Sequence, residues 1–137
     1  MPTAFDHEKL LAYQRALEFV TWVGPLIEEL PGKLSAKDQL DRASTSIALN
    51  IAEGNGKRSP ADRCRYLDIA RGSVVECPAC LNVLVARGKI ERATAAPGKA
   101  LLIEVVSMVA GLIARFGGEV REEQDAYSIA GITVEKE

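Results

Sequence analysis

The chain has 137 residues, the size of one ordinary domain, and 47% of them are hydrophobic, which excludes a disordered chain. The formal net charge of −2 excludes a strongly basic protein, although residues 31–92 hold 11 Lys and Arg against 7 Asp and Glu. Three cysteines do not indicate a disulfide framework, and no N-terminal run resembles a secretion signal. We therefore expect a cytoplasmic protein.

The first helix is predicted over residues 7–30, because apolar residues recur there at steps of three and four. Pro25 is expected to bend this helix, since proline lacks the N–H that bonds back one turn. The pair Pro31-Gly32 ends it.

A second helix is predicted over residues 35–54. Ser35 and Asp38 have the spacing of a capping box, with Asp in place of the usual Glu. Gly54 and Gly56 suit the left-handed turn that ends a helix.

The third helix, over residues 59–87, has the clearest start in the chain. Ser59 is predicted as its N-cap, with Pro60 in the first helical position and Asp62 in the third. Pro78 is expected to kink it.

A fourth helix is predicted over residues 98–116, after a loop at 94–98. Four helices joined by short loops predict an all-α fold, an antiparallel four-helix bundle over residues 1–117. The acidic segment 118–137 follows two glycines and is expected to be a flexible tail.

The fourth helix is apolar around most of its circumference. Its polar positions lie on one narrow stripe. A helix on the outside of a monomeric bundle needs only about a third of its circumference apolar. We therefore expect self-association through this helix, and no membrane span, because Glu104 and Arg115 interrupt the run over 100–116.

Cys77 and Cys80 have the spacing of a redox or zinc motif. They lie inside a predicted helix among apolar neighbours, and Cys64 and His7 would have to complete a zinc site. Buried, inert thiols beside Pro78 are the better interpretation. We expect no metal and no cofactor.

Polar residues lie on the facing sides of the second and third predicted helices. They are Asn50, Glu53, Ser73 and Glu76. A di-iron site needs Glu-x-x-His motifs that the sequence lacks. We expect a structural polar network instead, with Arg42 or Arg71 pairing the acids. No nucleophile has a base beside it, so we expect no enzyme.

The segment SIALNIAEGNGKRSPADRCRYLDIARGSVVE, residues 46–76, resembles a known signature. Its pattern, S-I-x-x-N-I-A-E-G-x-G-[RK]-x-S followed by F/Y-L-x-I-A-x-G-S-x-x-E, is that of the four-helix bundle proteins encoded in intervening sequences of bacterial 23S rRNA genes. The accessory proteins of diversity-generating retroelements look similar. The opening HEKLLAYQRALEFV also matches, so the resemblance covers residues 7–116.

The resemblance implies an up-down bundle that assembles as a homopentamer, without known enzymatic activity. It also implies a role in binding RNA or DNA. The matching residues carry over as a signature of the fold: Ser46, Asn50, Glu53, Gly54, Gly56, Lys57, Ser59, Arg71, Gly72, Ser73 and Glu76.

Nucleic-acid binding would use the cations of the basic middle region, because phosphate contacts need only positive charge in the right place. The hypothesis assigns them to Lys33, Lys37, Arg42, Lys57, Arg58, Arg63 and Arg65. The turn at 54–59 has the wrong spacing for a phosphate-binding loop, and a capped helix turn is the preferred interpretation. The alternative is an assembly scaffold whose partner is another protein and whose cations are merely solvated.

Overall fold

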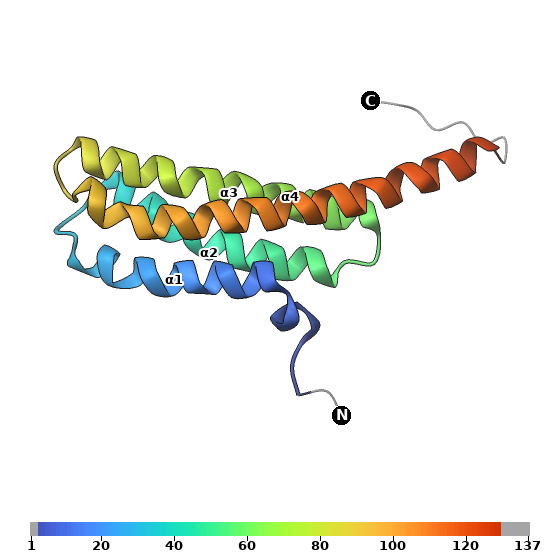
Figure 1. The fold of residues 1–137 in the computed structure, drawn as a ribbon, viewed down its shortest axis with the longest axis horizontal. Coiled ribbons are helices and arrows are strands. Elements are labelled where there is room, and N and C mark those ends of the chain that lie inside the picture. The colour runs from blue at the N-terminus through green and yellow to red at the C-terminus, as the bar shows by residue number, and fades with distance from the viewer. Residues whose placement is uncertain (1–2, 130–137) are drawn as a thin grey trace.

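The computed structural model describes residues 3–129 (Figure 1). This part of the chain holds four α-helices, one short 3-10 helix and no strand, which confirms the all-α class and the number of helices. The elements are η1 (Asp6–Lys9), α1 (Leu11–Glu29), α2 (Ser35–Gly56), α3 (Pro60–Ala86) and α4 (Arg92–Ile129).

Consecutive helices run alternately in opposite directions along the long axis of the molecule (Figure 1). Each helix packs against two others: α1 contacts α2 and α4, while α3 contacts the same two helices. The hydrophobic core lies between them and is mainly aliphatic. The largest fully buried side chains are Phe19, Leu40, Ile47, Ile51, Leu67, Leu81 and Leu84.

The first helix begins later than expected. Residues 6–9 form η1, and Leu10 has extended dihedral angles (φ −73°, ψ 128°) that separate it from α1. The predicted start at residue 7 was therefore wrong. The Glu8 carboxylate accepts the backbone N–H of Phe5 at 2.9 Å, and this bond caps the start of η1.

The starts of α2 and α3 differ in how well sequence predicts them. Ser59 caps α3 as expected, with its hydroxyl accepting the backbone N–H of Asp62 at 3.1 Å. The capping box predicted for α2 was wrong. Leu34 is the N-cap there and offers no side-chain bond, and the Ser35 hydroxyl accepts the Gln39 amide instead.

Gly54 and Gly56 do not form a left-handed turn. Both lie inside α2, and among the described residues only Gly32 (φ 64°) and Gly88 (φ 69°) have positive φ. Gly54 instead allows α2 and α3 to approach each other closely. A Cβ at this position would lie 3.2 Å from the Arg63 carbonyl oxygen and 3.2 Å from the Cβ of Tyr66.

The fourth helix is much longer than predicted. It begins at Arg92, so the loop expected at 94–98 is helical, and Pro97 is accommodated within this helix. Gly98 is buried against Trp22, whose ring occupies the space that a Cβ would need.

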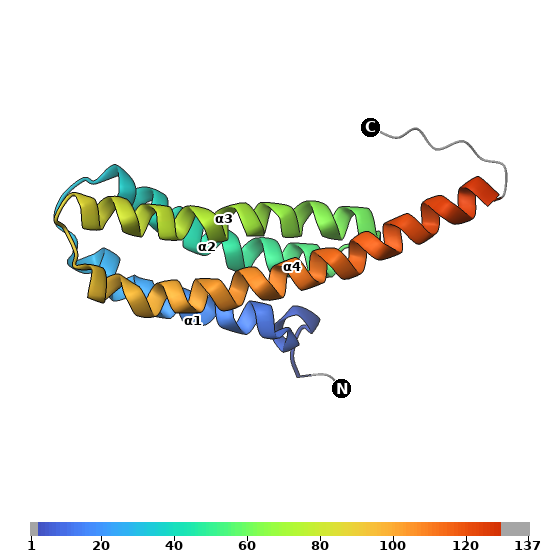
Figure 2. The same cartoon turned by 45° about the horizontal axis from the view of Figure 1, so that its top comes forward.

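At the other end, α4 runs through Gly117 and Gly118 to Ile129 and projects beyond the other helices (Figure 2). The predicted end at residue 116 was therefore wrong. Residues 119 and 120 are half-buried, whereas residues 121–126 are exposed. Residues 130–137 of the expected tail lie outside the described residues, and the division at 117 stays a prediction.

Candidate functional site

Two members of the predicted polar network, Asn50 and Ser73, meet Ser46 of the family signature between α2 and α3. Ser73 on α3 donates its hydroxyl to the Ser46 hydroxyl on α2 at 2.9 Å. The Asn50 amide donates to the same Ser46 hydroxyl at 3.0 Å and to its carbonyl at 2.9 Å. This chain of bonds joins the two helices at a half-buried position and fixes their register.

The charged members expected in this network take no part in its hydrogen bonds, although Arg42 lines a hollow together with Ser46 and Asn50. Glu53 pairs with Lys57 one turn along α2 at 3.6 Å. Arg71 pairs with Asp68 at 3.6 Å rather than with either glutamate. Arg42 and Glu76 are exposed, each lining a different surface hollow. The network is therefore neutral and does not use the acids.

The cations around the turn between α2 and α3 are mostly occupied. Arg63 donates to the carbonyl of Lys57 at 2.7 Å and lies 4.9 Å from the centre of the Phe116 ring. Lys57 and Arg65 lie 4.9 and 5.2 Å from the Tyr66 ring, with Glu53 and Asp62 as their respective acidic neighbours. Only Arg58 of the four is exposed without a salt bridge among the described residues.

The remaining predicted cations lie toward the opposite end of α2. Lys37 donates to the carbonyls of Leu30 and Gly32 at 2.9 and 3.3 Å, and so caps the end of α1. Lys33 lies in the loop before α2. Because α2 has 22 residues, its two ends are roughly 33 Å apart. The seven cations therefore form no single patch on one chain.

Lys33 has a neighbour that the sequence analysis missed. It shares a groove of about 410 Å³ with Arg87 and Glu76 between the start of α2 and the second half of α3. Arg87, Lys89 and Arg92 are all exposed around the α3–α4 turn. They escaped notice because 54 residues separate Lys33 from Arg87, and only the fold brings them together.

The surroundings of the three cysteines lower the reactivity of their thiols. Cys77 and Cys80 are buried and all three thiols are free. Desolvation by burial raises the pKa of Cys77 to about 12, with smaller effects of Cys80 and Glu76. Burial also raises the pKa values of Cys64 and Cys80. A raised pKa keeps a thiol protonated, and the protonated form is a poor nucleophile and metal ligand.

Metal-binding groups do not cluster within the described part of the chain. No three His, Cys, Asp or Glu side chains there are close enough together to hold an ion. The expectation of a protein without metal or cofactor stays a prediction.

The outer face of α4 carries a regular line of small side chains, which we call the α4 seam. Its members recur at alternating steps of four and three residues, and all are exposed. Ile103, at 67% exposure, is the largest of them. Glu104 lies beside the seam and pairs with Arg15 of α1 at 3.2 Å. The seam consists of Ala96, Ala100, Ile103, Ser107, Ala110 and Ala114.

By length and composition, α3 and α4 are apolar enough to cross a membrane. In α4 only 22% of the most apolar stretch is buried in the bundle. Among the described residues of α4, Ile103 is the one large apolar residue that is exposed, and the rest of the exposed apolar surface is mainly alanine.

Four long helices packed around one hydrophobic core, with a neutral polar contact between α2 and α3, define a small helical bundle protein. This chain belongs to the 23S rRNA-intervening sequence protein family, whose model matches residues 8–111. The family resemblance inferred from the motif over 46–76 is thereby confirmed.

A solved structure shows the same fold. It is the crystal structure at 1.70 Å of a protein with unknown function from the S23 ribosomal protein family of Bacteroides thetaiotaomicron. The two are similar with a TM-score of 0.71 at 24% sequence identity, over 75% of this chain and 98% of the other. No curated protein matches the chain.

Proposed function

We propose that this protein is a non-catalytic assembly protein of the cytoplasm, an antiparallel up-down bundle that self-associates through the α4 seam. The spacing of the seam residues is the observation that supports this proposal. Its alternating steps of four and three residues are the spacing with which helices pack side by side over several turns. Small side chains allow two helix axes to approach to the short end of the usual range, about 8 Å.

A second copy of the chain fits the seam better than a membrane does. Helices that lie on membranes present large apolar residues flanked by Lys and Arg. The seam offers mainly alanine, and its charged neighbour Glu104 is held by Arg15. Alanine contributes little apolar area to a lipid contact but removes steric obstacles between helices.

Replacing Ala110 with Glu tests the assembly. A charge buried in a helix–helix contact without a partner is costly, so we expect Ala110→Glu to dissociate the assembly. The matched control is Ala61→Glu, which makes the same change at an exposed position on α3. Multi-angle light scattering gives the masses, and circular dichroism checks that both variants fold.

Wild type and Ala61→Glu should have the same molecular mass, a multiple of the 14.8 kDa mass of one chain. Ala110→Glu should have the mass of a monomer. The resemblance implies five copies. A monomeric wild type, or an Ala110→Glu variant of unchanged mass, would contradict the proposal.

A second candidate function is association with RNA, favoured by the cations that no acid neutralises. Arg58 lies at one end of the bundle, while Lys33, Arg87, Lys89 and Arg92 lie at the other, and none forms a salt bridge with a described residue. Repetition of these weak patches in an assembly would add their affinities through multivalency.

A salt titration with fluorescent RNA tests this candidate. If Arg58 contacts a phosphate, Arg58→Gln should reduce the slope of log K against log salt by about 1. Arg71→Gln, which removes a cation already paired with Asp68, is the control and should leave the slope unchanged. Absence of binding by the wild type at low salt leaves the protein–protein scaffold as the better description.

A further inference from the structure

The end of the bundle where η1 meets α2 contains an open hollow of about 500 Å³. The residues around it combine aromatic, apolar and charged side chains from η1, from the start of α1 and from the end of α2. They are His7, Tyr13, Leu49, Ala52, Glu53, Gly56 and Lys57.

The short η1 segment is fixed in place at the edge of this hollow. The amide of Asn55, at the end of α2, donates to the Asp6 carboxylate at 2.9 Å. The Gln14 amide donates to the Glu8 carbonyl at 2.9 Å. With the Glu8 carboxylate on the Phe5 N–H, these bonds tie η1 to both α1 and α2. The side chains of η1 are therefore presented by an ordered turn.

That turn supports a ladder of three rings. Phe5 stacks on His7 with ring centres 5.9 Å apart and planes inclined by 19°. His7 in turn meets Tyr13 edge to face at 4.8 Å. The Phe5 side chain is nevertheless 74% exposed. An exposed aromatic ring held in a stack offers its surface to a planar partner.

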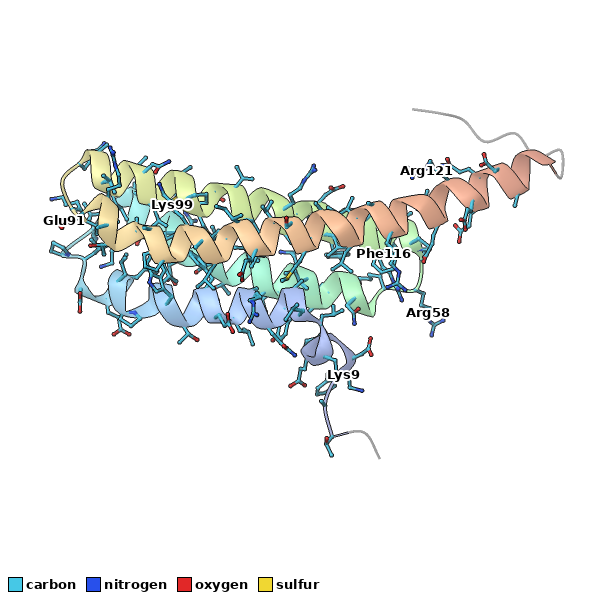
Figure 3. All side chains as sticks on the ribbon, in the orientation of Figure 1. Lys9, Arg58, Glu91, Lys99, Phe116 and Arg121 are labelled. Atoms are coloured by element: carbon cyan, nitrogen blue, oxygen red, sulfur yellow. The ribbon has the colours of Figure 1, made fainter. Side chains whose placement is uncertain are left out.

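Two cations lie at the same end of the molecule as the rings. Lys9 is the last residue of η1 and Arg58 follows α2, and both point outward there (Figure 3). Arg58 forms no salt bridge among the described residues, whereas Lys57 is shared between Glu53 and the Tyr66 ring. Arg58 and Lys9 are therefore the cations available to an anionic ligand.

We propose that this end of the bundle binds an unpaired nucleotide of a single-stranded nucleic acid, with its base stacked on the exposed ring of Phe5 beside the hollow and an adjacent phosphate at Arg58 or Lys9. Stacking on aromatic side chains beside a cationic track is how proteins hold single strands, and it requires bases that are not already paired. The inference rests on the RNA-association candidate above and assigns its ligand to single strands.

Fluorescence anisotropy with labelled 12-nucleotide strands tests this assignment. The probes are an oligo-uridine, the oligo-deoxythymidine of equal length and a duplex RNA of equal length. Phe5→Ala should weaken binding of the single strand about tenfold or more, the loss expected for one stacked base. Phe5→Trp should restore binding, since a larger ring stacks at least as well.

Leu11→Ala is the matched control. Leu11 is also a large exposed apolar residue near the N-terminus, at 50% exposure, but its side chain has no aromatic ring on which a base could stack. Its replacement should change the affinity by less than twofold. Equal affinity for the RNA and DNA strands would indicate base stacking alone, whereas a preference for RNA would indicate a contact to the ribose as well; both support the site.

Two results would overturn the site while leaving RNA association intact: unchanged binding by Phe5→Ala, or preference for the duplex. Failure of the wild type to bind any probe at low salt would overturn the site and the RNA-association candidate together. The hollow would then be left for a protein partner.

Discussion

Gly54 lies where α2 packs against the first turns of α3. Alanine normally favours a helix by about 1 kcal/mol over glycine. At position 54, however, the new methyl group would press on a backbone carbonyl and on the Cβ of Tyr66, neither of which can move alone. We therefore expect Gly54→Ala to lower the free energy of unfolding by about 1–3 kcal/mol, the usual cost of overpacking, in urea titrations followed by circular dichroism.

Gly72 provides the matched control, because no atom lies within 4 Å of a Cβ built there. Gly72→Ala should raise the free energy of unfolding by up to about 1 kcal/mol. If both variants gained stability equally, close approach of α2 and α3 would not be the reason for glycine at position 54.

The bond between Ser46 and Ser73 can be measured by a double-mutant cycle. A neutral hydrogen bond at a partly buried site contributes about 1 kcal/mol. We expect Ser46→Ala and Ser73→Ala to be non-additive by about that amount in chemical denaturation. Fully additive effects would show that the 2.9 Å contact does not couple the helices.

The raised pKa of Cys77 predicts that the folded protein loses stability at alkaline pH. The folded-state pKa of Cys77, about 12, lies above the ordinary 9.0, so between these values the unfolded chain has released a proton that the folded protein still holds. Stability is therefore complete below pH 9 and falls as the pH rises, at up to about 1.4 kcal/mol per unit. Cys77→Ala should flatten this slope between pH 9 and 11, whereas Cys64→Ala should change it much less because Cys64 is only half-buried.

At the scale of whole elements, α4 continues through a pair of glycines that was expected to end it. Gly117 and Gly118 suggested an end to the helix, yet each costs only about 1 kcal/mol in a helix interior. The residues that follow, including Glu119 and Arg121, are good helix formers and the helix continues. The low helix propensity of the two glycines is outweighed by the higher helix propensity of the residues that follow them.

The same observation gives a prediction for the projecting end of α4. A Cβ at Gly117 or Gly118 would meet nothing closer than the Arg121 guanidinium at 3.9 Å. Replacing both glycines with alanine should therefore stabilise the projecting turns and slow amide hydrogen exchange in residues 119–126. Residues 101–109, packed in the bundle, serve as the internal reference; unchanged exchange in 119–126 would argue against helix propensity as the limiting factor.

Helix starts illustrate when local sequence is sufficient. Ser59, Pro60 and Asp62 combine three independent preferences, and α3 begins where they predict. Ser35 and Asp38 had only their spacing, and α2 begins instead after Leu34, a partly buried residue that packs against the core. A boundary is predictable when several local effects agree and is decided by packing when they do not.

For the whole molecule, sequence predicted four helices and two members of the polar contact between α2 and α3, Asn50 and Ser73, because both follow from periodic patterns within single helices. The charged partners that were expected there are not part of the contact. It did not predict where the cations gather. Lys33 and Lys57 share one basic segment in sequence, but α2 carries them to opposite ends of the bundle, while Arg87 joins Lys33 from the C-terminal end of α3. Neighbours of this kind arise only from the arrangement of helices.

Assembly through the α4 seam should also make thermal stability depend on concentration. Association only of folded chains shifts the unfolding equilibrium by mass action. We therefore expect the Tm of the wild type to rise between 1 and 100 μM chain, these being about the concentrations accessible to calorimetry and fluorescence. The Tm of Ala110→Glu should stay constant; a constant wild-type Tm would contradict assembly in this range.

The packing of Trp22 against Gly98 gives the protein a built-in optical probe. Trp22 is the single tryptophan of the chain and lies near the ends of the bundle formed by the α1–α2 and α3–α4 turns, whereas Tyr13 and Tyr66 lie at the opposite end. Indole emission therefore reports on the contact between α1 and α4. Changes at that end of the bundle can be followed without any label as ligand or partner is added.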